Sequence, residues 1–366
     1  MTSLPVPRDS HPYHMHDAIL AQPDAIARML NEEQRSVERM ARLVGESERI
    51  HLVGIGTSWH AALVGEYMMH TIASREDVRA WNSFEFVTAP PSLDRSDAVI
   101  VLSHRGTKTY SADSLDLARA HGARTAVITG VGSAIDPAMA HAVIQTSVSD
   151  PSSAFTISHT GAMTALAMLT ATLASNRRRF RDELQRLPGL VTEALTQEPA
   201  VRDWAAATRG VERHYFTGWG PNASTAYEAA LKMKEANYTT TEGFHLEQYL
   251  HGPFVSTDDG CQVTFVVPPI VVPPMSGANR AIDVMNAANA VGARTAAIVQ
   301  AGDQERVSAA DTVIEAPAVS EALSPIPYLV PLQLYTYWLA VELGHNPDVF
   351  RLNDPRHLSA RDHYQL

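Results

Sequence analysis

The sequence has few cysteines, no excess of basic residues and no long apolar segment, and each shortage excludes a class of protein. Cys261 is the sole cysteine among 366 residues, which excludes an intramolecular disulfide and any zinc or iron–sulfur site built on several cysteines. The 40 acidic residues outnumber the 29 basic ones, and the formal net charge is −11. Because no basic patch stands out, we expect no nucleic-acid partner.

Segments that would direct the chain to a membrane are also missing from the sequence. Residues 1–20 contain no basic stretch followed by an apolar run, so no secretory signal is evident. The longest apolar stretch, Ala162 to Ala174, is interrupted by threonines and is shorter than the roughly 20 residues that span a bilayer. We therefore expect a cytoplasmic protein without a membrane partner, divided into two or three domains of about 100–200 residues each.

An internal repeat organises the chain. The segment GARTAVI at residues 122–128 recurs as GARTAAI at residues 292–298. Earlier in each half, HLVGIG at residues 51–56 has its counterpart in YFTGWG at residues 215–220, and each of these precedes an apolar-periodic helix pattern. A repeat with consistent flanks indicates two homologous halves, each reading strand, glycine turn, helix, strand, helix, strand.

The apolar runs of each half predict the fold class. Short continuous runs, such as residues 98–102, 126–128 and 263–267, are typical of strands buried on both faces of a parallel sheet. The sequence therefore predicts an α/β protein with two doubly wound domains, each a parallel sheet flanked by helices. We place an N-terminal helical segment at residues 1–46, a first domain at 47–195, and a second domain with a C-terminal tail at 196–366.

Two loops after predicted strands are suited to an anion. Gly56, Thr57 and Ser58 open a helix after the first strand, although Ser58 serving only as a helix cap is an alternative. The loop of residues 103–108, Ser-His-Arg-Gly-Thr-Lys, combines hydroxyl groups, a glycine and two cations before a helix. Both loops follow the carboxyl ends of strands, where ligands bind in open α/β sheets.

Neither a cofactor nor a metal is expected from the motifs. A dinucleotide-binding fingerprint would require glycine at the position of Trp59, so the first loop does not predict NAD binding. His11, His14 and His16 have a spacing that suggests a metal, but no matching carboxylate or cysteine cluster accompanies them. We therefore expect the chemistry of the protein to depend on its own side chains.

A predicted helix after the second glycine turn carries candidate catalytic groups. Glu228, Lys232 and Glu235 are spaced four and three residues apart, so they share one helix face. A salt-bridged surface stripe is the alternative interpretation. Downstream, His251 precedes a Gly-Pro turn, and an imidazole whose reference pKa is near neutrality suits proton transfer. A structural role for His251 fits the sequence equally well.

The order of these motifs resembles that of tandem SIS (sugar isomerase) domain proteins, above all the isomerase half of glucosamine-6-phosphate synthases. The resemblance extends over residues 12–358. It rests on YHM at 13–15, GTS at 56–58, Ser103 with Gly106, the acidic and basic residues of 228–235, HGP at 251–253 and PRHL at 355–358. The resemblance implies two tandem SIS domains, each with a sheet of the five-stranded type.

The resemblance also implies an activity and a role for each candidate residue. The substrate would be a small sugar or amino sugar that carries a 6-phosphate or a similar anionic group, such as a sulfonate. The reaction would be an open-chain 1,2-proton transfer. Glu235 would be the base, Lys232 would contact the sugar hydroxyls, and His251 would assist ring opening in the partner subunit of a homodimer. The implied substrate- or phosphate-binding residues are Gly56, Thr57, Ser58, Ser103, His104, Arg105, Gly106, Thr107, Lys108, Ser133, Glu228 and Arg361.

Departures from the family pattern leave the substrate open. The chain has no N-terminal cysteine, so we do not expect it to release ammonia from glutamine. Alanine stands at position 360, where the family has a Schiff-base lysine, and Arg361 follows it. His104, Arg105 and Lys108 replace small or amide residues, and residues 150–159 lack the family's glutamate and Thr-Lys pair. The alternatives are a non-catalytic sugar-phosphate sensor and an ammonia-dependent fructose-6-phosphate aminotransferase.

Overall fold

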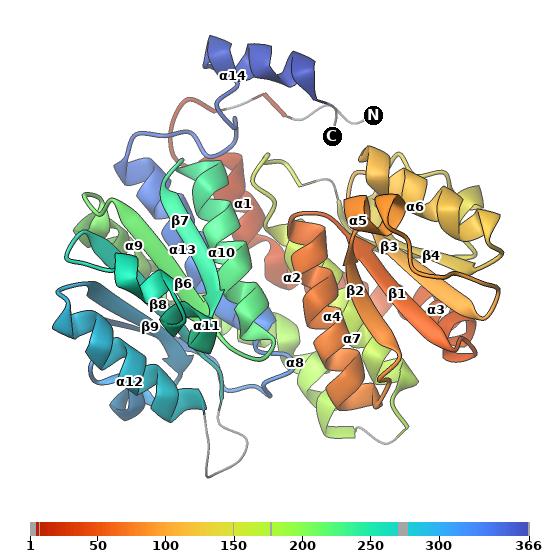
Figure 1. Ribbon diagram of the computed structural model, residues 1–366, viewed down its shortest axis with the longest axis horizontal. Coiled ribbons are helices and arrows are strands. Elements are labelled where there is room, and N and C mark those ends of the chain that lie inside the picture. Colours follow the sequence, from red (N-terminus) through yellow and green to blue (C-terminus); the bar gives the residue numbers. More distant parts are fainter. Residues whose placement is uncertain (1–4, 7, 149, 176–177, 270–276, 365–366) are drawn as a thin grey trace. The chain divides into compact units, whose positions relative to one another are not determined.

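The computed structural model describes residues 5–6, 8–148, 150–175, 178–269 and 277–364, which divide into two compact units (Figure 1). Unit 1 contains residues 21–185 and 349–366, and unit 2 contains residues 8–20 and 186–348. Each unit is built around one parallel five-stranded sheet, which confirms the predicted α/β class. No helix of the described residues is long and apolar enough to cross a bilayer.

Unit 1 has the strand order β2-β1-β3-β4-β5. The strands are β1 (Arg49–Gly54), β2 (Val78–Asn82), β3 (Asp97–Leu102), β4 (Arg124–Val131) and β5 (Ala142–Val148). Helices of this unit are α2 (Gln22–Glu32), α3 (Gln34–Gly45), α4 (Thr57–Ala73), α5 (Ser83–Thr88), α6 (Thr109–Ala120), α7 (Ile157–Leu173) and α14 (Pro355–Ala360). Every residue of β3 is buried, as the apolar run predicted, because helices cover the sheet.

Unit 2 repeats this topology, with the order β7-β6-β8-β9-β10 read from its β7 edge. The strands are β6 (Arg213–Gly218), β7 (Thr240–His245), β8 (Cys261–Val267), β9 (Arg294–Gln300) and β10 (Thr312–Ala316). Its helices are α1 (His14–Leu20), α9 (Glu198–Thr208), α10 (Asn222–Ala236), α11 (Leu246–Leu250), α12 (Gly277–Ala290) and α13 (Pro325–Glu342), while α8 (Arg178–Leu195) crosses the division between the units. The sequence repeat therefore corresponds to two copies of one strand order.

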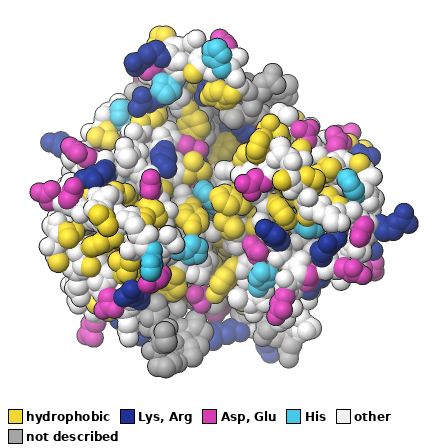
Figure 2. Space-filling model, in the orientation of Figure 1, with side chains coloured by type: hydrophobic (Ala, Val, Ile, Leu, Met, Phe, Trp, Pro, Cys, Tyr) yellow, Lys and Arg dark blue, Asp and Glu magenta, His cyan; other side chains and the backbone are white. Residues whose placement is uncertain are grey.

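The surface carries charges of both signs. Figure 2 shows acidic and basic side chains interspersed over the face that it presents, with no large patch of either sign. A surface of mixed charges does not by itself point to a binding site. The site therefore has to be sought at the edges of the two sheets, where loops follow the strands.

The repeated glycine turns hold each first helix against its strand. A Cβ atom on Gly54 would lie 2.5 Å from the backbone carbon of Ser58, and one on Gly218 would overlap the backbone oxygen of Asn222. Both neighbours are backbone atoms, which cannot move aside without shifting the helix. Glycine is therefore required where β1 joins α4 and where β6 joins α10, so that each helix starts close to the carboxyl end of its strand.

Gly54→Ala is expected to lower the free energy of unfolding by about 1–3 kcal/mol or more, because the new methyl group overpacks the start of α4. Urea denaturation followed by circular dichroism measures the change. Gly45→Ala is the matched control in the same unit, since a Cβ there would meet only Leu173 Cδ2, at 3.7 Å. Equal stability of the two variants would contradict the steric argument.

Candidate functional site

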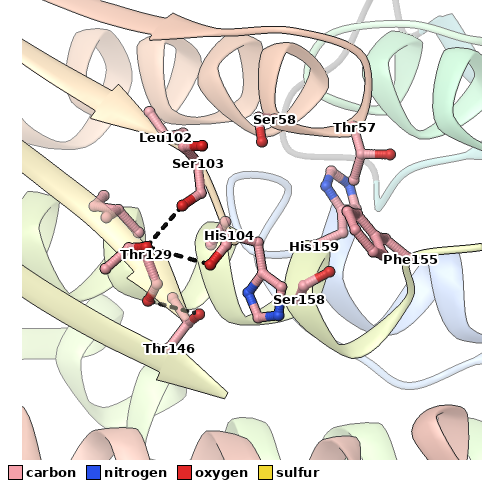
Figure 3. A pocket seen from close by; sticks show the side chains of 12 residues that line it. Thr57, Ser58, Leu102, Ser103, His104, Thr129, Thr146, Phe155, Ser158 and His159 are labelled. Carbon is pink, nitrogen blue, oxygen red and sulfur yellow. Dashed lines mark hydrogen bonds between the residues drawn. The ribbon is translucent and has the colours of Figure 1, made fainter. Parts of the chain in front are cut away.

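A small pocket of about 20 Å³, with room for a group the size of one water molecule, opens at the carboxyl ends of the strands of unit 1 (Figure 3). It is lined by residues that follow β1 and β3, lie on β4 and β5, or begin α7. These residues are Thr57, Ser58, Leu102, Ser103, His104, Ile128, Thr129, Thr146, Phe155, Ser158, His159 and Ala162. The lining contains hydroxyl groups and imidazoles but neither lysine nor arginine, so the pocket offers polar atoms without a permanent positive charge.

Four of the predicted anion-binding residues line this pocket, and several others belong to the loops after β3 and β4, whereas Glu228 and Arg361 lie on other elements. Thr57, Ser58, Ser103 and His104 contribute to the lining. Gly106 has a positive φ of 70°, and a Cβ there would lie 2.5 Å from Ser133 Oγ. The two loops that follow β3 and β4 are therefore packed tightly together. Thr107 is exposed, and Lys108 is half-buried just before α6 begins.

His104 is a neutral donor rather than a cation. Burial, and secondarily the charge of Arg105, lowers the pKa of His104 to about 4. The backbone N–H of Asp150 donates to His104 Nε2 at 3.0 Å, so that nitrogen carries no hydrogen and the proton resides on Nδ1. Nδ1 is buried and has no partner among the described residues. The positive charge that the sequence suggested at this position is therefore absent near neutral pH.

Arg105 is held by backbone oxygens and by Phe155, a residue of the pocket lining. Its guanidinium donates to the backbone oxygens of Asp150 at 3.4 Å and Ser152 at 3.3 Å, and it lies 4.6 Å from the ring centroid of Phe155. Burial lowers the pKa of Arg105. The side chain thus ties the loop after β3 to the segment before α7. This structural role was not evident from the sequence, in which Arg105 counted only as a cation beside an anion site.

Several pocket residues were not identified from the sequence. Thr129 and Thr146 are polar residues near the ends of the strands β4 and β5, while Ser158 and His159 lie in the first turn of the apolar helix α7. A hydroxyl group near the end of a strand has no distinctive pattern of its own. The only available signal was the position of these residues at strand ends, where parallel sheets bind ligands.

In unit 2, the predicted carboxylate and lysine residues of α10 meet in one buried cluster. Lys232 Nζ lies 3.5 Å from Glu228 Oε1 and forms a short ion pair with Glu235 Oε2. The side chains of Glu228 and Lys232 are each 1% exposed, whereas that of Glu235 is 22% exposed. The alternative of a surface stripe is therefore wrong, and Glu235 is the member of the cluster that a ligand can reach.

Strand β7 holds this part of α10 in place. Thr241 Oγ1 donates to the backbone oxygen of Ala230 at 2.8 Å, and a Cβ on Gly243 would lie 2.6 Å from the backbone oxygen of Ala226. At 1.5 Å per residue, Lys232 and Glu235 lie roughly 15–20 Å along the helix from its start. They are positioned by the packing of β7 on the helix rather than by the glycine turn at the helix start.

His251 and Arg361, two further sequence-predicted residues, are both exposed. The side chain of His251 is 69% exposed, and its Nε2 lies 3.4 Å from Glu247 Oε1. Glu247 also accepts two hydrogen bonds from Arg280, at 2.8 and 3.0 Å. Arg361 is exposed at the start of the C-terminal 3-10 turn Arg361–His363 in unit 1. Within the described residues, no group of three or more His, Cys, Asp and Glu side chains is arranged to hold a metal.

Comparison with known proteins shows a family domain and a likeness along most of the chain. Residues 43–172 match the SIS domain family. A glutamine–fructose-6-phosphate aminotransferase of Thermococcus kodakarensis is 30% identical over 348 residues, which are 92% of this chain and 56% of that protein. The chain thus spans little more than half the length of this relative.

Solved structures share the fold. The C-terminal domain of glucosamine-fructose-6-phosphate aminotransferase from Francisella tularensis matches with a TM-score of 0.82 and 21% identity, covering 94% of this chain and 99% of that one. Tagatose-6-phosphate ketose/aldose isomerase from Escherichia coli matches with a TM-score of 0.77 and 20% identity, covering 94% and 96%. Residues 43–172 therefore match the SIS domain family, and most of the chain is similar to part of the glutamine–fructose-6-phosphate aminotransferases.

Proposed function

We propose that the chain catalyses a 1,2-proton transfer on the open-chain form of a 6-phosphorylated, or similarly anionic, sugar or amino sugar. The reaction would be an aldose–ketose isomerisation or the removal of an amino substituent. The observation that carries the proposal is the buried cluster in which Lys232 bridges Glu228 and Glu235. The names of the similar proteins, an aminotransferase and a ketose/aldose isomerase, support the same substrate class.

The cluster has the composition that proton transfer beside a carbonyl group requires. Buried ion pairs contribute little stability compared with well-packed apolar residues, so two buried charged groups and a partly buried one on the same helix point to chemistry rather than to folding. Glu235, the most exposed of the three, is assigned the transfer of the proton between carbons 1 and 2. The Lys232 ammonium would stabilise the negative charge that develops on the enediolate oxygen.

The remaining groups are assigned supporting roles. Glu228 is fully buried and holds the Lys232 ammonium from the side opposite to substrate. The unit 1 loops that carry Thr57, Ser58 and Ser103 would bind the anionic sugar derivative through hydroxyl and backbone N–H groups. His251, which is exposed and paired only with Glu247, is assigned ring opening in the site of a second copy of the chain, which makes the active form a homodimer.

Incubation of the wild-type protein in deuterium oxide with a panel of aldose, ketose and amino-sugar 6-phosphates tests the proposal. We expect one solvent deuterium atom at carbon 1 or carbon 2 of the accepted substrate, detected by mass spectrometry and proton NMR, because the abstracted proton exchanges with solvent. The corresponding unphosphorylated sugars are the control and should not exchange. Tight binding of a sugar phosphate without exchange across the panel would overturn the proposal in favour of a sensor.

A further inference from the structure

The hydroxyl groups on one wall of the unit 1 pocket already donate their hydrogens to other atoms of the protein. Thr129 Oγ1 donates to the backbone oxygens of Ser103 and His104, at 2.7 and 3.2 Å (Figure 3). Thr146 Oγ1 donates to the backbone oxygen of Thr129 at 3.1 Å. A hydroxyl group has one hydrogen, so each of these oxygens can only accept a hydrogen bond from a ligand.

The hydroxyl hydrogen of Ser158 is likewise donated within the protein, to a buried carboxylate. Its hydroxyl donates to Asp150 Oδ2 at 3.2 Å, and its backbone N–H also points to that oxygen, at 3.4 Å. The backbone N–H of Thr156 donates to Asp150 Oδ2 at 2.9 Å. Asp150 is fully buried. Because its carboxylate accepts from these amide groups at the start of α7, they are not available to bind an anionic ligand.

Ser103, which lies next to Thr129, adds a donor to the pocket. Ser103 is 4% exposed, and its Oγ has no hydrogen-bond partner in the part of the chain that the structure describes. Because Ser103 lines the pocket and a buried hydroxyl without a partner is costly, this group is available to a ligand. The pocket thus combines a wall of acceptors with at least one donor, which suits an oxygen that both donates and accepts.

We propose that the wall formed by Thr129, Thr146 and Ser158 binds a ligand oxygen that carries a hydrogen, and that Asp150 is the specificity-determining residue behind that wall. This assignment deepens the proposed function and rests on it for the sugar derivative as ligand. The oxygen belongs to a sugar hydroxyl group or to a singly protonated phosphate. A sulfonate or sulfate oxygen, which has no hydrogen, would face acceptor lone pairs and the charge of Asp150.

Inorganic phosphate and sulfate provide a matched pair of probes at about pH 8, where both are dianions of similar size but only phosphate keeps a hydrogen. Isothermal titration calorimetry of the wild-type protein is expected to show binding of phosphate that is tighter than that of sulfate by about tenfold or more. Equal affinity for the two ions, or binding of neither, would overturn the assignment.

Asp150→Asn tests the role of the carboxylate. Asparagine retains an oxygen that accepts from Thr156, but the hydroxyl of Ser158 no longer faces a negative charge and can donate to an anion. We expect sulfate to bind more tightly, so that the preference for phosphate falls by about tenfold. Asp354→Asn is the matched control, because Asp354 also accepts a backbone hydrogen bond, from Arg356 at 2.9 Å, but lies at the start of α14. An unchanged preference in Asp150→Asn would overturn the assignment.

Ser158→Ala supplies a second variant in case Asp150→Asn does not fold. It removes one acceptor of the wall and should also reduce the preference for phosphate over sulfate, whereas an unchanged ratio would count against the assignment.

The affinity for glucose 6-phosphate between about pH 5.5 and 8 distinguishes the two sources of the hydrogen. A decrease above about pH 6 identifies phosphate as the donor, and a constant affinity identifies a sugar hydroxyl. Ion binding does not depend on turnover, so failure of deuterium exchange leaves this result interpretable.

Discussion

Glu235→Gln is expected to reduce the rate of solvent deuterium incorporation by about 10²- to 10⁴-fold, the range typical for removal of a general base. The amide is nearly the same size as the carboxylate and can still accept a hydrogen bond from Lys232, but it cannot take up a proton from carbon. Initial rates of deuterium incorporation at carbon 1 or 2, measured under saturating substrate, give the effect.

The comparison with Glu212→Gln separates loss of the base from loss of charge. Glu212 is an exposed residue of the same unit, just before β6, and its substitution should leave the exchange rate within about twofold of wild type. Calorimetry should show that Glu235→Gln still binds the sugar phosphate, since binding of the anion is assigned to unit 1. Equal exchange rates in wild type and Glu235→Gln would remove Glu235 from the mechanism.

The architecture of both units follows from sequence patterns that act locally. The repeated segments at residues 51–56 and 215–220 became β1 and β6 with their glycine turns, and those at 122–128 and 292–298 became the starts of β4 and β9. Continuous apolar runs indicated buried strands because a parallel sheet is covered on both faces. These features depend on neighbouring residues and on periodicity, which a single sequence displays directly.

The roles of His104 and Arg105 could not be predicted because they depend on residues far along the chain. The charge state of His104 is set by burial and secondarily by Arg105, and its tautomer is set by the backbone N–H of Asp150, 46 positions later. Carbonyl groups of the same segment hold the side chain of Arg105. Residue type alone suggested that His104 adds to the charge of the loop and that Arg105 is one of two cations at an anion site. The three-dimensional contacts instead give a neutral donor and a structural tie, so the pocket lining itself carries no permanent cation.

The spacing of residues on α10 gave a correct cluster but not its burial. Residues four and three apart share a helix face in any helix, whether that face is solvated or packed. The packing of β7 and α13 against α10 determines that this helix face is buried, and it leaves Lys232 only 1% exposed. A lysine at this depth can be retained only with partners, because a buried charge without compensation is strongly disfavoured.

Lys232→Met is therefore expected to lower the free energy of unfolding by about 3–5 kcal/mol, because it leaves the buried Glu228 carboxylate without its cation. Methionine approximates the length and volume of the lysine stem, so little of the loss arises from a cavity. Urea denaturation monitored by circular dichroism and tryptophan fluorescence measures the change. Lys234→Met is the matched control on the same helix, since Lys234 is exposed and should change the stability by no more than about 0.5 kcal/mol.

Neutralising the carboxylates distinguishes the charge effect from a packing effect. Replacement of a buried ion pair by neutral groups is often close to neutral for stability, whereas removal of one partner is not. Adding Glu228→Gln and Glu235→Gln to Lys232→Met should therefore restore most of the lost stability. If the triple variant were as unstable as Lys232→Met alone, the destabilisation would come from altered packing of α10 against β7 and α13, and the electrostatic account of the cluster would be wrong. A Lys232→Met variant as stable as Lys234→Met would contradict the burial of the charge itself.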